Sequence, residues 1–169
     1  MKIAFLISTL SSGGAERVAT TLMNHWAEKG HQVAFFTFEK EGQKPNYPLN
    51  SNVELFQLNL LKVVGGKFDF IIQNMHRVLI TRHSIKKYNP DVVLSFICET
   101  NIILLLSTIG VKCPKIISER IHPGFHKQRK IDNFFRRITY PLASSIIVQT
   151  VDIKNWMLRE LTLRSIVLP

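Results

Sequence analysis

Hydrophobic and polar residues form two recurring patterns along this chain: short continuous apolar runs and longer stretches with helical spacing. The first apolar run, at 2–8, ends in small polar residues and glycines, as is typical of a strand covered on both faces. Residues 15–29 then repeat apolar side chains at helical spacing, with Val18, Leu22 and Trp26 on one line. The chain is therefore expected to open with a buried strand followed by an amphipathic helix.

The same alternation continues to the end of the sequence. We expect further strands at 31–38, 53–58, 91–96, 115–118, 145–149 and 165–169, and further helices at 68–88, 101–108, 130–140 and 151–161. Repeated strand–helix units predict an α/β fold: a Rossmann-like, open, mainly parallel sheet with helices on both faces. Ligands of such sheets bind beyond the carboxyl ends of the strands, so the loops that follow the strands are the candidates for chemistry.

Length and composition predict one domain. The chain has 169 residues, 46% of them apolar, which is enough for one core of usual size and too little for two. We expect 1–165 to form this domain and 166–169 to begin a linker to a further domain. Cys98 and Cys113 lack the spacing of a zinc site or a disulfide framework, which favours a reducing, cytoplasmic setting. The longest apolar stretch, 102–111, falls short of the roughly 20 residues that cross a bilayer, so we expect no transmembrane helix.

The strongest local motif is Ser11-Ser-Gly-Gly-Ala-Glu-Arg17, which joins the first strand to the first helix. Gly13 and Gly14 permit a ligand to approach the backbone closely, and the free N–H groups of a helix N-terminus attract anions such as phosphate. The motif is neither GxGxxG nor a Walker loop, so it matches neither the dinucleotide nor the nucleoside-triphosphate pattern. A glycine turn that only packs the helix on the strand explains these residues equally well.

Several segments together carry a resemblance to a known family. They are Lys2-Ile-Ala-Phe-Leu6, Ser12-Gly-Gly-Ala-Glu-Arg-Val18, Trp26-Ala-Glu-Lys-Gly-His-Gln-Val33, Asp91-Val-Val-Leu-Ser-Phe96 with Thr100-Asn101, Ile117-Ser-Glu-Arg120 and Ile166-Val-Leu-Pro169. In this order, over essentially the whole chain, they resemble the family-4 retaining glycosyltransferases. The resemblance implies a GT-B enzyme of two Rossmann-like domains, of which this chain is the N-terminal, acceptor-side one. The other domain would hold most of the nucleotide-sugar donor, with Gly13 and Gly14 facing the donor diphosphate.

Further candidates follow the later strands. Glu119 and Arg120 come after a short strand, where they could orient sugar hydroxyls or a lipid phosphate. Many relatives place a histidine near this point, so the resemblance makes Glu119, Arg120 and His122 the catalytic candidates. A surface ion pair on a loop is the competing interpretation of the charged residues. Glu99, Asn101 and Arg120 are the acceptor-binding candidates, although Thr100 or Asn101 could instead cap the next helix, which is the interpretation we favour.

We predict no metal site and no cofactor. His122 and His126 have the spacing of a helical metal pair, but Pro123 and Gly124 between them oppose a helix. A divalent metal is not required, because cationic side chains and helix ends can hold a diphosphate.

Two basic stretches have more than one possible role at the surface. The first comprises His76, Arg77, Arg82, His83, Lys86 and Lys87; the second comprises Lys127, Arg129, Lys130, Arg136 and Arg137, interleaved with Phe125, Phe134 and Phe135. Such segments suit contact with an anionic membrane or a phosphate-bearing acceptor. A solvated basic face with phenylalanines in the core is an equally good interpretation.

The leading hypothesis is the acceptor-binding half of a retaining transferase. It would transfer a sugar from a nucleotide-sugar donor to a glycan or lipid-linked acceptor, in polysaccharide, lipopolysaccharide or glycolipid synthesis. The net charge of +10 suggests a nucleic-acid-binding or nucleotide-binding module as the alternative, but no helix-turn-helix, RRM, zinc or GxGxxG pattern accompanies it. We expect a monomer, inactive without its other half, with no nucleic-acid partner, in the cytoplasm or peripheral on the inner face of the cell membrane.

Overall fold

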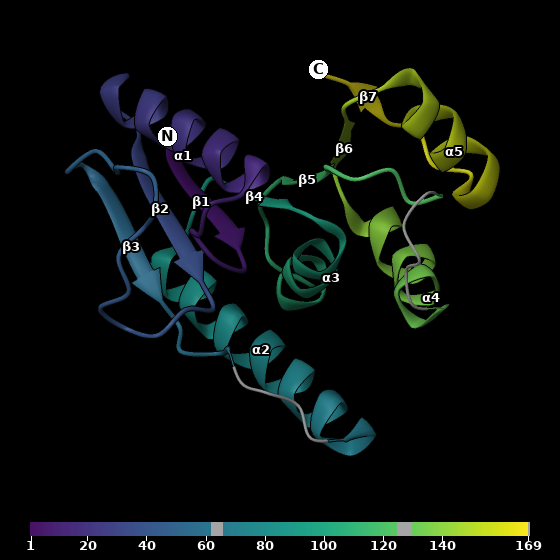
Figure 1. The fold of residues 1–169 in the computed structure, drawn as a ribbon, viewed down its shortest axis with the longest axis horizontal. Helices are drawn as coiled ribbons and strands as arrows, with labels where there is room; N and C mark the ends of the chain where they lie inside the picture. The colour runs from purple at the N-terminus through teal and green to yellow at the C-terminus, as the bar shows by residue number, and fades with distance from the viewer. Residues whose placement is uncertain (62–65, 125–129, 169) are drawn as a thin grey trace.

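Figure 1 shows helices packed on both sides of a twisted sheet; this computed structural model describes residues 1–61, 66–124 and 130–168. In chain order the elements are β1 (Lys2–Ile7), α1 (Gly14–Glu28), β2 (Gln32–Thr37), β3 (Val53–Gln57), α2 (Lys67–Tyr88), β4 (Val92–Phe96), α3 (Cys98–Ser107), β5 (Lys115–Glu119), α4 (Lys130–Thr139), a 3₁₀ turn η1 (Tyr140–Leu142), β6 (Ser145–Val148), α5 (Val151–Leu161) and β7 (Ile166–Val167). The expected elements are confirmed. The largest shift is at α3, which begins at Cys98 and not near Asn101.

The strands of the described residues form one open sheet in the order β3-β2-β1-β4-β5-β6-β7, and every pairing is parallel. The predicted fold class is therefore confirmed. Ile166 and Val167 pair with β6 as an edge strand, so the sheet extends into the segment that we expected to begin a linker. The linker itself stays a prediction. The strand order reverses between β1 and β4, which makes the carboxyl ends of these two strands the crevice where ligands of open α/β sheets bind.

Alternating side chains of the strands supply two apolar cores, one on each face of the sheet. On one face Phe5 packs against Phe35 and Phe96, with ring centroids 5.4 and 4.8 Å apart, and α1 covers these rings with Met23 and its neighbours. On the other face α2, α3, α4 and α5 cover the remaining side chains of the strands. The central strands β1, β2 and β4 are buried on both sides, which explains their continuous apolar runs.

The helix ends follow from local chemistry. Gly30, with φ +80°, takes the left-handed conformation just after α1, where glycine carries no steric penalty. Asn89 ends α2 in the same conformation, and Pro90 follows it. The Thr150 hydroxyl accepts the N–H of Ile153 and begins α5. Among the described residues, no helix has both the length and the apolar character needed to cross a membrane.

Candidate functional site

The glycine loop lies at the carboxyl end of β1, beside the point where the strand order reverses. Gly13 is the N-cap of α1 in an extended conformation, and Gly14 is the first residue of that helix. A Cβ added to Gly13 would collide with the Glu16 carboxylate, which folds back over the start of the helix. A Cβ added to Gly14 would meet no other atom within 4 Å. The fold therefore does not require glycine at position 14 and leaves open space beside that part of the backbone.

A buried carboxylate anchors this loop. The backbone N–H of Leu10 donates to Oε1 of Glu39 at 3.0 Å, and both residues are almost fully buried. The Leu10 carbonyl oxygen accepts the N–H of Asn46 at 2.9 Å. Glu39 was not among the site residues predicted from the sequence. The available signal was an acidic residue two positions after the apolar strand β2, at the same sheet edge as the glycines.

The second loop of the crevice joins β4 to α3 through a strained residue. Ile97 is the N-cap of α3 with φ 72° and ψ 138°, a positive-φ conformation that is rare for a β-branched side chain and costs about 1–3 kcal/mol. Because Ile97 is the N-cap and no side chain caps this helix, the interpretation of Thr100 or Asn101 as a helix cap is wrong. Glu99 lies in the first turn of α3, exposed at the rim of the crevice.

Asn101 lies inside the molecule and connects several elements. Its Oδ1 accepts the Ser95 hydroxyl at 2.7 Å, while its Nδ2 donates to the Ser118 carbonyl oxygen at 3.1 Å and to the Tyr140 hydroxyl oxygen at 3.2 Å. These bonds tie β4, β5 and η1 to α3 beneath the crevice. A direct contact of Asn101 with an acceptor stays a prediction.

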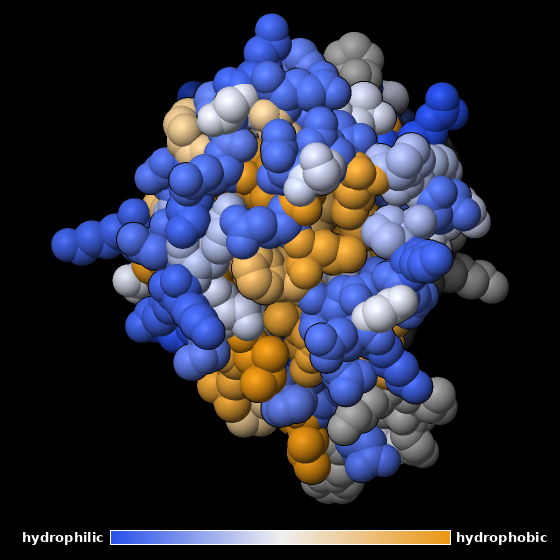
Figure 2. Space-filling model, turned by 90° about the vertical axis from the view of Figure 1, so that its left-hand side faces the viewer, coloured by the Kyte–Doolittle hydropathy of each residue, from blue (hydrophilic) through white to orange (hydrophobic). Residues whose placement is uncertain are grey.

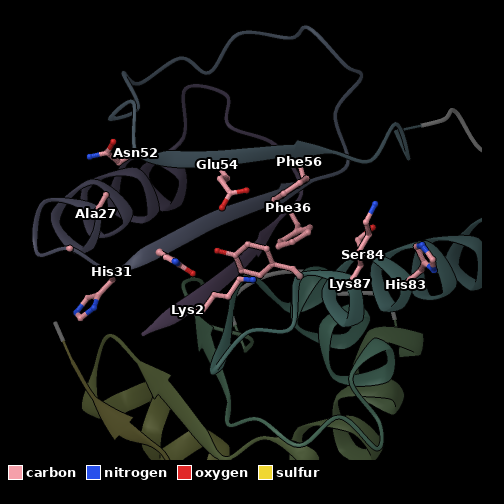
Figure 3. Close-up of a pocket in the computed structure, with 13 residues that line it drawn as sticks. Lys2, Ala27, His31, Phe36, Asn52, Glu54, Phe56, His83, Ser84 and Lys87 are labelled. Carbon is pink, nitrogen blue, oxygen red and sulfur yellow. The ribbon is translucent and has the colours of Figure 1, made fainter.

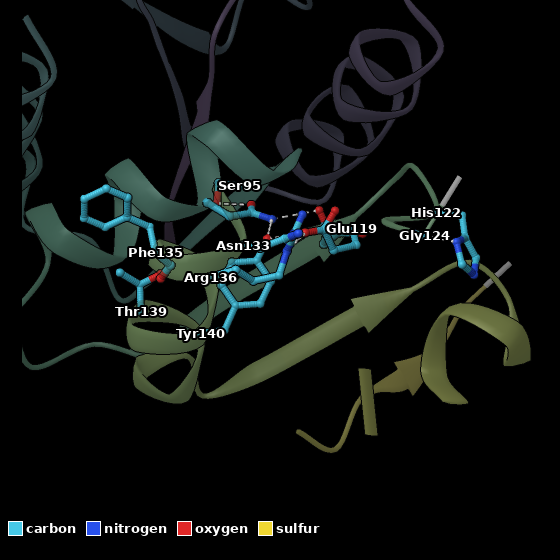
Figure 4. Close-up of polar contacts among 11 residues, drawn as sticks. Ser95, Glu119, His122, Gly124, Asn133, Phe135, Arg136, Thr139 and Tyr140 are labelled. Carbon is cyan, nitrogen blue, oxygen red and sulfur yellow. Dashed lines mark hydrogen bonds and ion pairs between the residues drawn. The ribbon is translucent and has the colours of Figure 1, made fainter. Parts of the chain in front are cut away.

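Glu119 ends β5 and points beneath α4, where it forms a buried ion pair (Figure 4). Its Oε1 accepts Nε–H of Arg136 at 2.9 Å and the Tyr140 hydroxyl. Arg136 Nη1 also donates to Oδ1 of Asn133 at 2.5 Å. The glutamate and the arginine are both almost completely buried, so the interpretation of Glu119 as part of a surface ion pair is wrong. The signal for Arg136 was its helical spacing of four from Tyr140, which puts both residues on the core side of α4 and η1.

Burial and the charge of the partner have opposite effects on the pKa of each residue in this pair. Burial raises the pKa of Glu119, and the Arg136 charge and the Tyr140 hydroxyl limit that rise. Burial alone would lower the pKa of Arg136, but attraction to Glu119 outweighs it and raises that pKa. A guanidinium keeps its proton in proteins, so the carboxylate that neutralises it is held as an anion. We regard the pair as charged.

Arg120, the next residue, is directed to the other face of the sheet. Its guanidinium carbon lies 4.7 Å from the centroid of the Phe96 ring, which packs on the α1 side. Partial burial lowers the pKa of Arg120. Glu119 and Arg120 are therefore not brought together, because consecutive residues at a strand end point to opposite faces. Their catalytic roles stay predictions.

His122 is held apart from the Glu119–Arg136 pair, as Figure 4 shows. Its Nε2 lies 3.1 Å from Oδ2 of Asp152, and its Nδ1 accepts the N–H of Gly124 at 3.0 Å. The described part of this loop is not helical, and His126 lies outside the described residues. In the residues that the structure describes, no three side chains of metal-ligating type cluster. The catalytic role of His122 and the absence of a metal requirement stay predictions.

Two large cavities lie at opposite ends of the sheet. One, of about 730 Å³, is at the amino ends of the strands, where Lys2, Glu54 and Phe56 face Ser84 and Lys87 of α2 (Figure 3). The other, of about 660 Å³, reaches Ser8 and Glu99 at the carboxyl ends and continues between α2, α3 and α4. We place the candidate site at the carboxyl ends, although the cavity there is the smaller, because the strand order and the glycine loop mark that edge.

The basic stretches have partly structural roles. Arg82 Nη1 donates to the carbonyl oxygens of Ser107 and Ile109, at 2.9 and 2.6 Å, and so binds the end of α3. In α4 Arg136 is buried and Phe134 is exposed, whereas Phe135 packs against the core and Arg137 is exposed. The interpretation of a solvated basic face with core phenylalanines is therefore wrong for Arg136 and Phe134. Phe125, Lys127 and Arg129 lie outside the described residues.

Comparison with known proteins gives the family of this chain. Residues 12–167 match the family described as Glycosyltransferase Family 4, and the chain belongs to this family. The chain is 34% identical over 148 residues to GalNAc-alpha-(1->4)-GalNAc-alpha-(1->3)-diNAcBac-PP-undecaprenol alpha-1,4-N-acetyl-D-galactosaminyltransferase of Campylobacter jejuni, which covers 88% of this chain and 40% of that protein. The expected family is thus confirmed.

Solved structures show the same fold. Sucrose-phosphate synthase from Thermosynechococcus elongatus matches all of this chain with a TM-score of 0.80 at 12% identity, over 48% of its own length. The lipopolysaccharide outer core galactosyltransferase WaaB matches 95% of this chain with a TM-score of 0.62 at 15% identity, over 42% of its length. The chain therefore spans less than half the length of these proteins and has the fold of one half of a GT-B glycosyltransferase.

Proposed function

We propose that this chain is the acceptor-side half of a retaining glycosyltransferase that extends a lipid-linked glycan. The observation that carries the proposal is the open start of α1 at Gly14, at the crevice of a family-4 chain. The free N–H groups there would face the donor diphosphate once the other half closes over them. The lipid-linked acceptor is proposed from the C. jejuni relative, whose name specifies a diNAcBac-PP-undecaprenol acceptor.

The proposed chemistry depends on positioning and electrostatics. Retaining transfer needs stabilisation of the departing diphosphate and a correctly placed acceptor hydroxyl, both of which preorganised donors supply. Gly13 and Gly14 would serve the diphosphate, and Glu99 and Arg120 at the rim would orient the acceptor. The Glu119–Arg136 pair would hold the end of β5 in place. The proposal includes no cofactor and no divalent metal, and it includes a peripheral contact with an anionic membrane, which the net charge of +10 favours.

Transfer by the full-length protein tests this function. The protein is incubated with single nucleotide sugars, a lipid-linked oligosaccharide and either EDTA or Mg²⁺, and products are identified by mass spectrometry. One added sugar, with the anomeric configuration of the donor retained, is the expected result. No transfer to any lipid-linked acceptor would contradict the proposal. This chain alone should show no turnover and only weak binding of nucleotide sugars, because the opposite wall of the cleft is absent.

A further inference from the structure

The apolar groove of about 660 Å³ between α2, α3 and α4 is open to solvent along part of its length. Ile102, Ile103 and Leu106 of α3 line it from one side, and Phe70 and Met75 of α2 from another. Its volume lies within the range of about 300–1,000 Å³ that is usual for ligand sites. Its size and its apolar lining fit a hydrocarbon ligand.

Large apolar side chains remain exposed along this groove. On α2 Ile71, Met75 and Leu79 follow one another at a spacing of four, line the groove, and are each more than half exposed. Ile131 lines it from α4 and is also exposed. Figure 2 shows that apolar side chains also reach the surface toward the bottom of that face of the molecule. Contiguous exposure of this kind marks a binding surface more often than a solvated one.

Half of the polar residues that line the groove lie at the edge of the sheet, and the others, Asn74, Arg77 and Asp132, come from α2 and α4. Ser8 follows β1, while Glu99 and Thr100 open α3, so these residues join the groove to the crevice of the candidate site. Arg77 contributes a cation, which is held by its bond from Nε to the Leu60 carbonyl oxygen at 3.3 Å. The groove thus has polar groups where it meets the site and a mainly apolar length between the helices, with these three helix residues as the exceptions. An occupant with a polar head and a hydrocarbon chain matches this arrangement.

We propose that the groove binds the first isoprenoid units of a lipid-linked acceptor, next to its diphosphate. The inference rests on the proposed function and names where its acceptor is held. The relative that acts on a diNAcBac-PP-undecaprenol acceptor aligns with 88% of this chain, and the groove is continuous with the crevice. The groove accepts a single hydrocarbon chain, whereas a bilayer would also contact exposed side chains outside the groove lining, such as Ile72. Chain binding would hold the glycan end of the acceptor at the switch point.

Photocrosslinking to the full-length protein tests this site without turnover. The probe is a sugar-free polyprenyl diphosphate with a diazirine on its first isoprene units, presented in detergent micelles. Labelled peptides from α2 and α3 are expected. Met75→Gln and Leu79→Gln should weaken probe binding about tenfold, since each makes an apolar wall polar. Ile72→Gln is the matched control, because Ile72 lies on the same helix, is 65% exposed and does not line the groove, and its variant should bind the probe normally.

The alternative occupants give different results. Equal losses of probe binding in all three variants would indicate general contact with the micelle or bilayer and would overturn the proposal. Label outside α2, α3 and α4 would also overturn it. Dimerisation that Met75→Gln abolishes, seen by sedimentation of the ligand-free protein, would assign the groove to a second copy of the chain and exclude the acceptor chain.

Kinetics separates this inference from the proposed function. Wild-type enzyme should have a higher kcat/KM for an acceptor with a polyprenyl chain than for the same glycan diphosphate on a short alkyl chain. Met75→Gln should remove this preference while leaving turnover of the short acceptor unchanged. Equal use of both acceptors by the wild type would end the groove proposal and leave the function intact. Crosslinking in the groove without transfer to any acceptor would support binding in the groove and contradict the proposed function.

Discussion

The ends of β1 and β5 lie on the same edge of the sheet, but the polar groups are enclosed and bonded at β5 and lie beside open space after β1. At the end of β5, Glu119 is enclosed, and Arg136 and Tyr140 donate to its carboxylate. After β1, the loop ends in the start of α1, where the space beside Gly14 is empty. The first N–H groups of a helix have no partner within the helix. The β5 end is therefore a closed support, whereas the start of α1 leaves open space beside Gly14, where we propose that an anion binds.

The two regions are therefore expected to matter for different properties, one for stability and the other for ligand binding. A charge pair that is buried and internally bonded affects mainly the free energy of unfolding, because removal of one partner strands the other. An open helix start affects mainly ligand binding, because the fold does not depend on it. The following predictions, in order of decreasing effect, test whether the two regions divide stability and activity in this way.

The largest effect is expected from Glu119→Leu. The substitution leaves the Arg136 charge buried without its partner, so the free energy of unfolding should fall by about 3–5 kcal/mol, measured by urea denaturation of this chain. The double variant Glu119→Leu/Arg136→Met removes both charges and should recover most of the loss. A single variant that is nearly as stable as the wild type would mean that the pair does not support the β5 end.

Gly14→Val should reduce activity strongly and leave stability nearly unchanged. In the full-length enzyme a side chain here obstructs approach of the diphosphate, and kcat should fall about a hundredfold, equivalent to roughly 3 kcal/mol in the transition state. The unfolding midpoint should change little, because the added atoms enter empty space. Gly14→Ala should give an intermediate rate. If Gly14→Val keeps most of its turnover while it loses thermal stability, the loop only packs α1 on β1.

Glu39→Leu tests whether the open loop needs its own buried anchor. The change leaves the Leu10 N–H without its acceptor, and the expected loss is about 1–3 kcal/mol of unfolding free energy. Hydrogen exchange of the Leu10 amide should accelerate by more than that of the core strands. Glu39→Gln keeps an oxygen at this position and serves as the control. Unchanged exchange at Leu10 in Glu39→Leu would show that other contacts hold the loop.

The smallest expected effect is a loss of folding stability at alkaline pH through Cys98, which lies near the Glu119–Arg136 pair. Burial, followed by the Glu119 charge, raises the pKa of Cys98 from its ordinary 9.0 to about 12. A raised pKa stabilises the fold below the unfolded pKa, and this contribution is lost as pH rises from about 9 to about 12. At pH 10 the loss should be about 1.4 kcal/mol. Urea titrations at pH 8 and pH 10 should show a smaller decrease for Cys98→Ala than for the wild type; equal decreases would contradict the assignment.

Local patterns determined most of the fold. The apolar run of β1, the stripe of α1 and the stop at Asn89-Pro90 each depend on neighbours within a few residues, and for that reason their type and bounds could be predicted. The position of the glycine loop at the carboxyl edge follows from the same alternation of strands and helices. The family could likewise be inferred from motifs that keep their order along the chain, since order is a property of sequence.

The tertiary structure alone decided what each site residue contacts. Glu119 and Arg136 are 17 positions apart, and only the packing of α4 over β5 joins them and turns an expected surface charge into a buried one. The bond between Leu10 and Glu39 spans 29 positions for the same reason. The groove between α2, α3 and α4 has no sequence motif, because its walls come from helices whose exposed apolar faces look, in sequence, like faces that pack into the core. Burial and pairing depend on which elements meet in space, and the local pattern of a sequence does not encode that.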